Sequence, residues 1–367
     1  MEKKKIIYIA EFSLPNMSAY AIHVLKMCDN FCKYAEVELI IPYQERSYYF
    51  KKIKKEYLLK SNFKIKSMFS SKKKLNLISR IFFSLKIYNY LNLNNHKMII
   101  SRAIIPSLTL AIMNKKNILE LHSEMTGLTK CLFEFSNFKF ISKNLKFILL
   151  HSKLLRLLKI KSKNVCILGD AVESNDFNRK ILKTKLLTCA YSGSFAKGKG
   201  LELIYSIANK APKINFHIFG NIKTLDKDIS LKKVPKNIRF KGFLSYNMIA
   251  NILPKYKVLL MPYQKKVGVL IKKIDVASYF SPLKLFEYMA TGRTIIASDL
   301  KVYKGILINN YNSKILNPKN TNKWIEAINE IFKSNKYNYL GRNAKKDVKK
   351  YTWDNRVEKI ITFSRLF

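Results

Sequence analysis

The chain alternates short apolar runs with segments in which apolar residues recur at helical spacing. In the first half the apolar runs lie at 6–10, 37–41, 98–101, 117–121, 147–150 and 165–168. Helical spacing fills the segments between them, at 18–31, 106–113 and 152–159. This alternation is typical of buried parallel strands joined by crossover helices. The first half is therefore predicted to be an α/β domain.

The same alternation restarts after residue 183. Strand-like runs lie at 186–192, 215–220, 258–263 and 294–297. A chain of 367 residues is too long for one ordinary core. The pattern thus predicts two domains, 1–175 and 183–350, and a terminal helix, 351–367, that crosses back to the first domain.

A helix in the second half has start and stop signals on both sides. Ser281 is a suitable N-cap, Pro282 suits the first helical position, and Gly292 suits a left-handed end. The amides of such a first turn and the charge of Lys284 would attract an anion. Glu287, one turn further on, can accept hydrogen bonds from a sugar diol. The alternative is an amphipathic helix with a solvated Lys and Glu.

A glycine-rich loop precedes another helix of the second half. It reads Gly193-Ser-Phe-Ala-Lys-Gly-Lys-Gly200 and follows the strand-like run 186–192. Glycines let the backbone approach phosphate oxygens, and lysine ammonium groups neutralise them. The alternative is a surface loop without a ligand. Both stretches together predict a nucleoside diphosphate site.

The stretch that begins at Ser281 resembles the donor-binding signature of the family-4 retaining glycosyltransferases. It reads Ser-Pro-Leu-Lys-Leu-Phe-Glu-Tyr-Met-Ala-x-Gly-x-x-Ile-Ile-Ala-Ser-Asp-Leu. The resemblance implies an α/β protein with the GT-B fold, two Rossmann-like α/β/α domains facing across a cleft. It also implies that Glu287 binds the donor ribose. The first Glu of the family's E-x7-E pair is replaced by Tyr279, which puts the role of that carboxylate in doubt.

The resemblance implies further donor-binding positions. Lys199 matches the family's phosphate-binding lysine, and Lys197 would compensate for Ser194, which stands where the family often has arginine. Gly220 ends a strand, and Phe243 lies in the turn that the family places beside the nucleobase. The implied donor-binding residues are Ser194, Lys197, Lys199, Gly220, Phe243, Ser281, Pro282, Leu283, Lys284 and Glu287.

His122 is the candidate catalytic residue of the first half. The segment Ile118-Leu-Glu-Leu-His122-Ser123 resembles the strand end at which the family places a histidine beside the transferred sugar. A neutral imidazole there can hydrogen-bond sugar hydroxyls. His23 is expected to be an ordinary core or surface histidine.

The net charge of +45 predicts attraction to anionic surfaces. Segment 51–95 interleaves lysines with apolar residues, and on helical spacing Leu77, Ile81, Leu85 and Tyr88 share one side. That pattern suits a helix in a membrane interface, while the alternative is a core-facing helix with a basic rim. Nucleic acid is not expected as a partner, because no recognised reading module is present.

The remaining features narrow the class of protein. Five scattered cysteines suggest neither a disulfide framework nor a metal cluster. No apolar run reaches the roughly 18 residues of a membrane span, and no signal peptide is visible, so we expect a cytoplasmic protein with possible attachment to the inner face of the membrane. The first glycine of the chain is Gly127, which argues against an N-terminal NAD or FAD site.

Together these features predict a retaining glycosyltransferase that acts without a metal or a cofactor. It would move a sugar from a UDP- or GDP-linked donor to a glycan or lipid-linked glycan in bacterial surface polysaccharide synthesis, such as capsule or lipopolysaccharide. Lysines and helix amides would then stabilise the departing diphosphate. The alternative is a catalytically impaired, basic subunit that docks on a membrane or a partner, as Tyr279 suggests.

Overall fold

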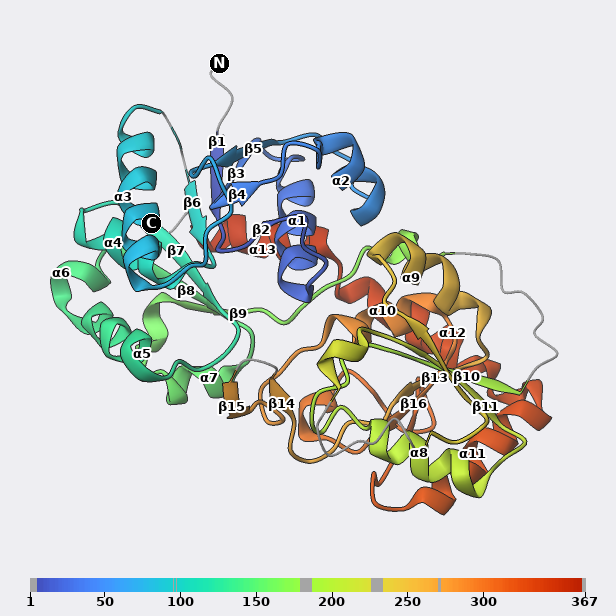
Figure 1. Ribbon diagram of the computed structural model, residues 1–367. Helices are drawn as coiled ribbons and strands as arrows, with labels where there is room; N and C mark the ends of the chain where they lie inside the picture. Colours follow the sequence, from blue (N-terminus) through green and yellow to red (C-terminus); the bar gives the residue numbers. More distant parts are fainter. Residues whose placement is uncertain are drawn as a thin grey trace. The chain divides into compact units, whose positions relative to one another are not determined.

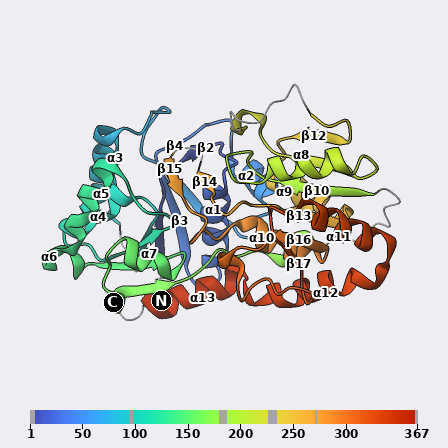
Figure 2. The same cartoon turned by 90° about the horizontal axis from the view of Figure 1, so that it is seen from below.

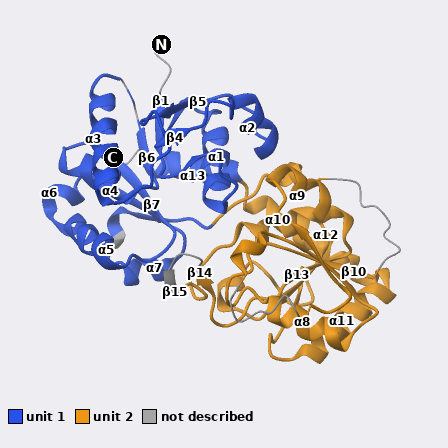
Figure 3. Ribbon diagram, in the orientation of Figure 1, with its two compact units in different colours: residues 1–169, 353–367 blue, residues 170–352 orange. Residues whose placement is uncertain are grey.

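The computed structural model divides the chain into two compact units (Figure 3). Unit 1 comprises residues 1–169 and 353–367, and unit 2 comprises 170–352. The structure describes residues 5–94, 96, 98–178, 187–225, 234–269 and 272–364. The chain passes between the units at Gly169 and again at Thr352, so the terminal helix belongs to unit 1.

Unit 1 is built on a parallel sheet with the strand order β5-β3-β1-β6-β7-β8-β9 (Figure 1). Its strands are β1 (Lys5–Ile9), β3 (Glu36–Ile41), β5 (Lys64–Ser67), β6 (Met98–Ser101), β7 (Asn117–Leu121), β8 (Leu145–Leu149) and β9 (Val165–Ile167), with a small pair β2 (Ser13–Leu14) and β4 (Tyr43–Gln44). Its helices are α1 (Ala19–Phe31), α2 (Phe50–Tyr57), α3 (Leu77–Asn92), α4 (Ile104–Ile112), α5 (Gly127–Glu134), α6 (Lys139–Ser142), α7 (Ser152–Leu157) and α13 (Trp353–Ser364).

Helices cover both faces of this sheet. Helix α1 packs against α2 and α13, while α4 packs against α3, α5 and α6. The core beneath α3 and α4 joins apolar strand residues to one side of α3, and it includes Ile7, Ile40, Phe83, Ile87 and Leu110. Apolar residues on both faces of the strands are what a doubly covered parallel sheet requires.

Helix α3 has two apolar sides. Phe83, Ile87 and Leu91 are buried in the core, whereas Ile81 and Leu85, on the side that the sequence singled out, are exposed. The two interpretations of this segment therefore describe different sides of one helix. The core-facing side packs α3 onto the sheet, and the other side exposes apolar side chains to solvent.

Unit 2 repeats the plan with the strand order β12-β11-β10-β13-β16-β17. Its strands are β10 (Thr188–Ser192), β11 (Asn215–Phe219), β12 (Ile238–Gly242), β13 (Val258–Met261), β16 (Thr294–Ser298) and β17 (Lys314–Leu316). Its helices are α8 (Leu201–Lys210), α9 (Tyr246–Ile252), α10 (Leu283–Thr291), α11 (Thr321–Lys333) and α12 (Asn338–Asp347). Helices α8 and α11 pack together, and α10 packs against α12 (Figure 2).

The polar connection from 264 to 279 has secondary structure of its own. It contains an antiparallel ribbon of β14 (Gly268–Val269) and β15 (Lys272–Asp275). The ribbon is tied to the glycine-rich loop, because the Gly268 amide donates to the carbonyl of Lys197 at 3.0 Å. Asp275 Oδ1 also accepts the amides of Val267 and Ala277. These hydrogen bonds order a polar segment. Its strands could not be recognised from the sequence, because the segment has no apolar periodicity.

Candidate functional site

Each unit has one place where its strand order reverses. In unit 2 the chain leaves β10 toward β11 and later leaves β13 toward β16, so the reversal lies between β10 and β13. In unit 1 it lies between β1 and β6. Open parallel sheets bind ligands at the carboxyl ends of the strands on either side of such a reversal. The candidate residues of both units cluster at these two places.

The glycine-rich loop of unit 2 packs tightly against the segment that leaves β13. Gly198 and Gly200 have φ angles of +77° and +89°, which favour glycine. A Cβ atom would lie 1.9 Å from the carbonyl oxygen of Lys266 at Gly198 and 1.9 Å from that of Pro262 at Gly200. The glycines are thus required for close backbone packing, and this packing places Lys199 beside Tyr263.

Two lysine ammonium groups converge on the ring of Tyr263. Lys199 Nζ lies 4.7 Å from the ring centroid, and Lys284 Nζ lies 5.0 Å from it. Lys284 Nζ also lies 3.8 Å from the centroid of Tyr191. Aromatic faces attract cations, and these rings hold both ammonium groups in place. The structure therefore brings together a lysine of the glycine-rich loop and a lysine in the first turn of α10, which are far apart in the sequence.

These ammonium groups are incompletely compensated. Lys284 is 8% exposed, and among the described residues its Nζ has no hydrogen-bond acceptor. Burial and the nearby charge of Lys199 hold the pKa of Lys284 well below its usual range, although Glu287 partly opposes this. Burial also lowers the pKa of Lys199 to about 8. A bound anion would relieve both effects, since it would pair with the ammonium groups in a poorly hydrated site.

Gly193 makes room for the ammonium group of Lys284. A Cβ atom at this position would lie 2.4 Å from Lys284 Nζ. Gly220 has a related role, because a Cβ there would lie 2.1 Å from the carbonyl oxygen of Gly193. Gly220 thus contacts the loop that surrounds the lysine site. Because Gly220 has no side chain, the backbone of that loop can pack directly against it.

Helix α10 begins one residue later than the sequence suggested. Pro282 occupies the N-cap position and Leu283 is the first helical residue, so the expectation of Ser281 as N-cap is wrong. The hydroxyl of Ser281 instead accepts the backbone amide of Asp170 at 2.9 Å. The Leu285 amide donates to the Pro282 carbonyl at 2.9 Å, which leaves the amides of Leu283 and Lys284 for an anion. The helix ends at Gly292, with φ +68°, as expected.

The other predicted donor residues lie around this cluster in different ways. Glu287 is half-buried on α10, one turn from Lys284. The Ser194 carbonyl accepts the Tyr191 hydroxyl at 2.8 Å. Lys197 and Phe243 are exposed. Tyr279, which replaces the family's first Glu, is 1% exposed, so its side chain packs inside unit 2 and offers no surface to a ligand.

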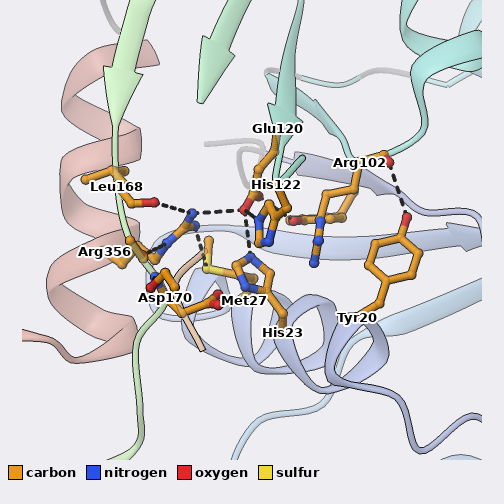
Figure 4. Close-up of polar contacts among 12 residues, drawn as sticks. Tyr20, His23, Met27, Arg102, Glu120, His122, Leu168, Asp170 and Arg356 are labelled. Carbon is orange, nitrogen blue, oxygen red and sulfur yellow. Dashed lines mark hydrogen bonds and ion pairs between the residues drawn. The ribbon is translucent and has the colours of Figure 1, made fainter. Parts of the chain in front are cut away.

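In unit 1, His122 is bound to a carboxylate that the sequence analysis did not single out (Figure 4). Its Nε2 lies 2.6 Å from Glu120 Oε1, on the same strand end. Burial and the charge of Arg102 lower the pKa of His122 to about 4, although Glu120 opposes this. The ring is therefore neutral near pH 7. With Nε2–H donating to Glu120, Nδ1 is the nitrogen that can accept a hydrogen bond from a sugar hydroxyl.

Glu120 is the centre of a buried network. It accepts hydrogen bonds from the Tyr8 hydroxyl and from Arg356 Nη2, each at 2.9 Å, and His23 Nε2 lies 2.8 Å from it. Burial alone would raise the pKa of Glu120, but Arg356, His23 and the hydrogen bond from His122 hold it well below its usual range. His23 is thus a buried residue of this network, 1% exposed. The network fixes the orientation of His122.

Sequence reasoning missed several of these residues for an identifiable reason. Tyr191 and Glu120 lie within apolar strands, Tyr263 just beyond one, and Arg356 on the terminal helix. Each looks like an ordinary strand or helix residue in the sequence. The one usable signal is position, since Tyr191, Tyr263 and Glu120 all lie at the carboxyl ends of strands, where parallel sheets bind ligands.

Comparisons with known proteins agree with this geometry. Residues 172–347 match the model of the family Glycosyl transferases group 1. A glycosyltransferase from Rickettsia africae superposes with a TM-score of 0.73 at 13% identity, covering 100% of this chain and 98% of that one. A search of the curated proteins finds none that matches.

Two other solved structures are similar over nearly their whole length. HepE from Anabaena, in complex with UDP and glucose, has a TM-score of 0.72 at 9% identity and covers 98% of this chain and 99% of that one. The lipopolysaccharide outer core galactosyltransferase WaaB has a TM-score of 0.63 at 15% identity, with 98% and 99% coverage. At these identities the likeness concerns the fold. The chain has the α/β architecture of the GT-B glycosyltransferases, and its residues 172–347 match the group 1 family model; together these findings support a glycosyltransferase.

Proposed function

We propose that this protein transfers a sugar from a nucleotide-sugar to a glycan or lipid-linked glycan acceptor, with retention at the anomeric carbon and without a metal ion. The observation that carries the proposal is the pair of ammonium groups, Lys199 and Lys284, on the ring of Tyr263. A diphosphate is the anion that suits two neighbouring cations and the free amides of a helix start. Glu287 would then bind the ribose hydroxyls.

The chemistry follows from where the charges lie. The bond between the anomeric carbon and the diphosphate oxygen breaks, and the acceptor oxygen forms a bond to the same carbon on the same face. The proton of the acceptor hydroxyl passes to the departing diphosphate. Negative charge accumulates on that diphosphate, and Lys199 and Lys284 would stabilise it in a site that water reaches poorly. His122 Nδ1 would accept a hydrogen bond from the transferred sugar.

A UDP-linked donor is the first one to test, because HepE is described in complex with UDP and with UDP-glucose. Similar folds named for lipopolysaccharide synthesis make a surface glycan the acceptor to consider first. GDP-linked donors remain the second arm of the test. The catalytically impaired subunit is the second candidate, because Tyr279 does not take the place of the missing carboxylate in the site.

Calorimetric titration with UDP and with GDP tests the proposal. We expect one nucleotide to bind, and its affinity to fall as the pH rises through about 8, because the pKa of Lys199 lies there and the deprotonated amine does not attract the diphosphate. Lys199→Met should weaken binding about tenfold or more. Lys213→Met, an exposed lysine of the same unit, should leave it unchanged.

The outcomes separate the candidate functions. Binding and sugar release from the matching nucleotide-sugar, both unchanged by EDTA, would support the metal-independent enzyme. Nucleotide binding without turnover in the presence of a range of membrane glycan extracts would favour the impaired subunit. If neither nucleotide binds, the proposed function is wrong.

We also propose that unit 1 docks on an anionic membrane. Helix α3 exposes Ile78, Ile81, Phe82 and Leu85, and the segment through α5 and α6 exposes Leu128, Phe135, Phe138 and Phe140. Helix α4 packs against both elements, so the segments that carry the two exposed sets both lie next to α4. Exposed lysines at 72–74, 86, 130, 139 and 143 accompany them. Apolar side chains with a basic rim suit a lipid interface.

Removing the aromatic side chains of α5 and α6 should abolish most membrane binding. Phe135, Phe138 and Phe140 are 50%, 53% and 56% exposed, and their loss removes apolar area that would enter the interface. Sedimentation with vesicles containing phosphatidylglycerol should show at least a tenfold weaker association for the triple serine variant. A matched triple serine variant of Ile222, Met248 and Ile308, which are similarly exposed in unit 2, is the control. Equal binding by both variants would contradict the proposed docking surface.

A further inference from the structure

Arg102 lies at the place where the strand order of unit 1 reverses. It directly follows β6, and its amide donates to the carbonyl of Ile9, the last residue of β1, at 2.9 Å. The backbone of Arg102 is therefore tied to both strands that flank the reversal. Ligands of open parallel sheets bind at such a place.

The guanidinium group of Arg102 is held by an aromatic ring. Its Cζ lies 4.3 Å from the centroid of Tyr20. The Tyr20 hydroxyl in turn accepts the Glu11 amide at 3.0 Å and donates to the Arg102 carbonyl at 3.3 Å. Tyr20 is thus anchored to the segments that follow both β1 and β6, so the ring and the guanidinium are positioned before any ligand arrives. Figure 4 shows Arg102 between Tyr20 and His122.

The charge of Arg102 has no carboxylate of its own among the described residues. The neighbouring acids are already paired: Glu11 Oε2 lies 3.2 Å from Arg80 Nε, and Glu120 binds Arg356. Arg102 Nη1 is buried and has no hydrogen-bond acceptor within the part of the chain that the structure describes. A buried donor without an acceptor is costly, and a guanidinium is suited to bidentate binding of an oxyanion.

We propose that Arg102 binds an anionic group, a carboxylate or a phosphate, on the substrate that unit 1 holds. This inference rests on the proposed function, because it makes the acceptor of the transfer an acidic one. His122, on the next strand end, would then contact the reacting sugar while Arg102 fixes the anion. The sugar acids and sugar phosphates of surface glycans share this chemistry.

Binding of three matched sugars tests the inference: glucuronate, glucose 1-phosphate and methyl glucoside, with UDP at saturation so that the Lys199 and Lys284 site is occupied. We expect one of the two anions to bind at least tenfold more tightly than the neutral sugar, which also identifies the anionic group. Arg102→Gln should remove that preference. Arg102→Lys keeps the positive charge but cannot form two parallel hydrogen bonds to an oxyanion, so it should retain part of that preference. Arg342→Gln, an exposed arginine of α12, should retain all of it.

The outcomes distinguish this inference from the proposed function. If the folded Arg102→Gln or Arg102→Lys protein binds the anions as the wild type does, or if the wild type has no preference for them, the inference is wrong while UDP binding still stands. If UDP does not bind but the anion preference depends on Arg102, the proposed function is wrong and the anion site remains. Circular dichroism and thermal unfolding confirm that each variant is folded.

Discussion

Lys284→Met should slow sugar transfer at least about 100-fold and at the same time make the protein more stable. The ammonium group of Lys284 is buried without an acceptor among the described residues, a situation that costs about 1–3 kcal/mol. Methionine fills a similar volume with no polar group, and it packs well against the rings of Tyr191 and Tyr263. Removing one group that stabilises developing charge typically lowers kcat by about 100- to 1000-fold.

Two measurements check this prediction. Thermal unfolding without nucleotide should show a higher Tm for Lys284→Met than for the wild type, and the stabilisation by UDP that we expect for the wild type should be lost in the variant. Lys213→Met, at an exposed position, should change neither quantity. A lower Tm together with retained UDP stabilisation would mean that Lys284 is a structural residue. A higher Tm together with lost UDP stabilisation would mean that Lys284 serves binding although it lowers the stability of the protein.

Glu120→Gln should destabilise unit 1 by about 3–5 kcal/mol, because it leaves a buried Arg356 without its counter-charge. Arg356 is 4% exposed and Glu120 is 2% exposed, so solvent does little to screen either charge. The control is Glu134→Gln, the same change at an exposed carboxylate of unit 1, which should leave the stability of the unit nearly unchanged. If both variants unfold alike, the Glu120 network contributes little.

The unfolding of unit 1 can be followed on its own. The sequence contains two tryptophans, Trp324 in unit 2 and Trp353 in unit 1. Trp353 lies in the Glu120 network, with its ring centroid 4.9 Å from that of His23. In a Trp324→Phe background, urea titration monitored by fluorescence therefore reports on unit 1. The difference between Glu120→Gln and Glu134→Gln in that background is the quantity to compare.

The same network predicts a loss of stability in acid. The folded pKa of Glu120 lies well below its usual range, so its stabilising charge is present above the unfolded pKa and is lost as the pH falls through the folded value. His122 acts in the same direction, because its folded pKa of about 4 lies below the unfolded value of about 6.5. The unfolded state therefore takes up more protons between those values. Unit 1 should become less stable as the pH falls from about 6.5 to 4 because of His122, and Glu120→Gln should flatten the further loss below pH 4.5, where the carboxylate itself takes up a proton.

Much of the fold could be predicted from the sequence because its signals are local. Apolar runs placed the strands of both sheets except the edge strands β5, β12 and β17, and Ser18 and Ser245 cap α1 and α9 through their side chains. Gly292 ends α10 in the left-handed region. Each of these signals depends on residues within a few positions of one another, so the sequence contains the whole of the relevant physics.

Other parts of the site depended on partners that are distant in the sequence. Ser281 resembles an N-cap, but its hydroxyl accepts the amide of Asp170, over one hundred positions away. Glu120 resembles a misplaced charge in an apolar strand until Arg356, from the terminal helix, comes to lie beside it. Local propensity cannot predict such pairs, because the two partners come into contact only after the sheet and its helices have packed.

The sequence by itself therefore determined the α/β class, the glycine-rich loop and the presence of lysines suited to an anion. Only the tertiary structure decided that Lys199 and Lys284 share the ring of Tyr263, that His122 is neutral, and that Arg102 keeps a buried donor without an acceptor among the described residues. The physical reason is that charge, burial and hydrogen-bond satisfaction belong to a site's surroundings. Those surroundings are assembled by strand order, which brings together residues that the chain keeps far apart.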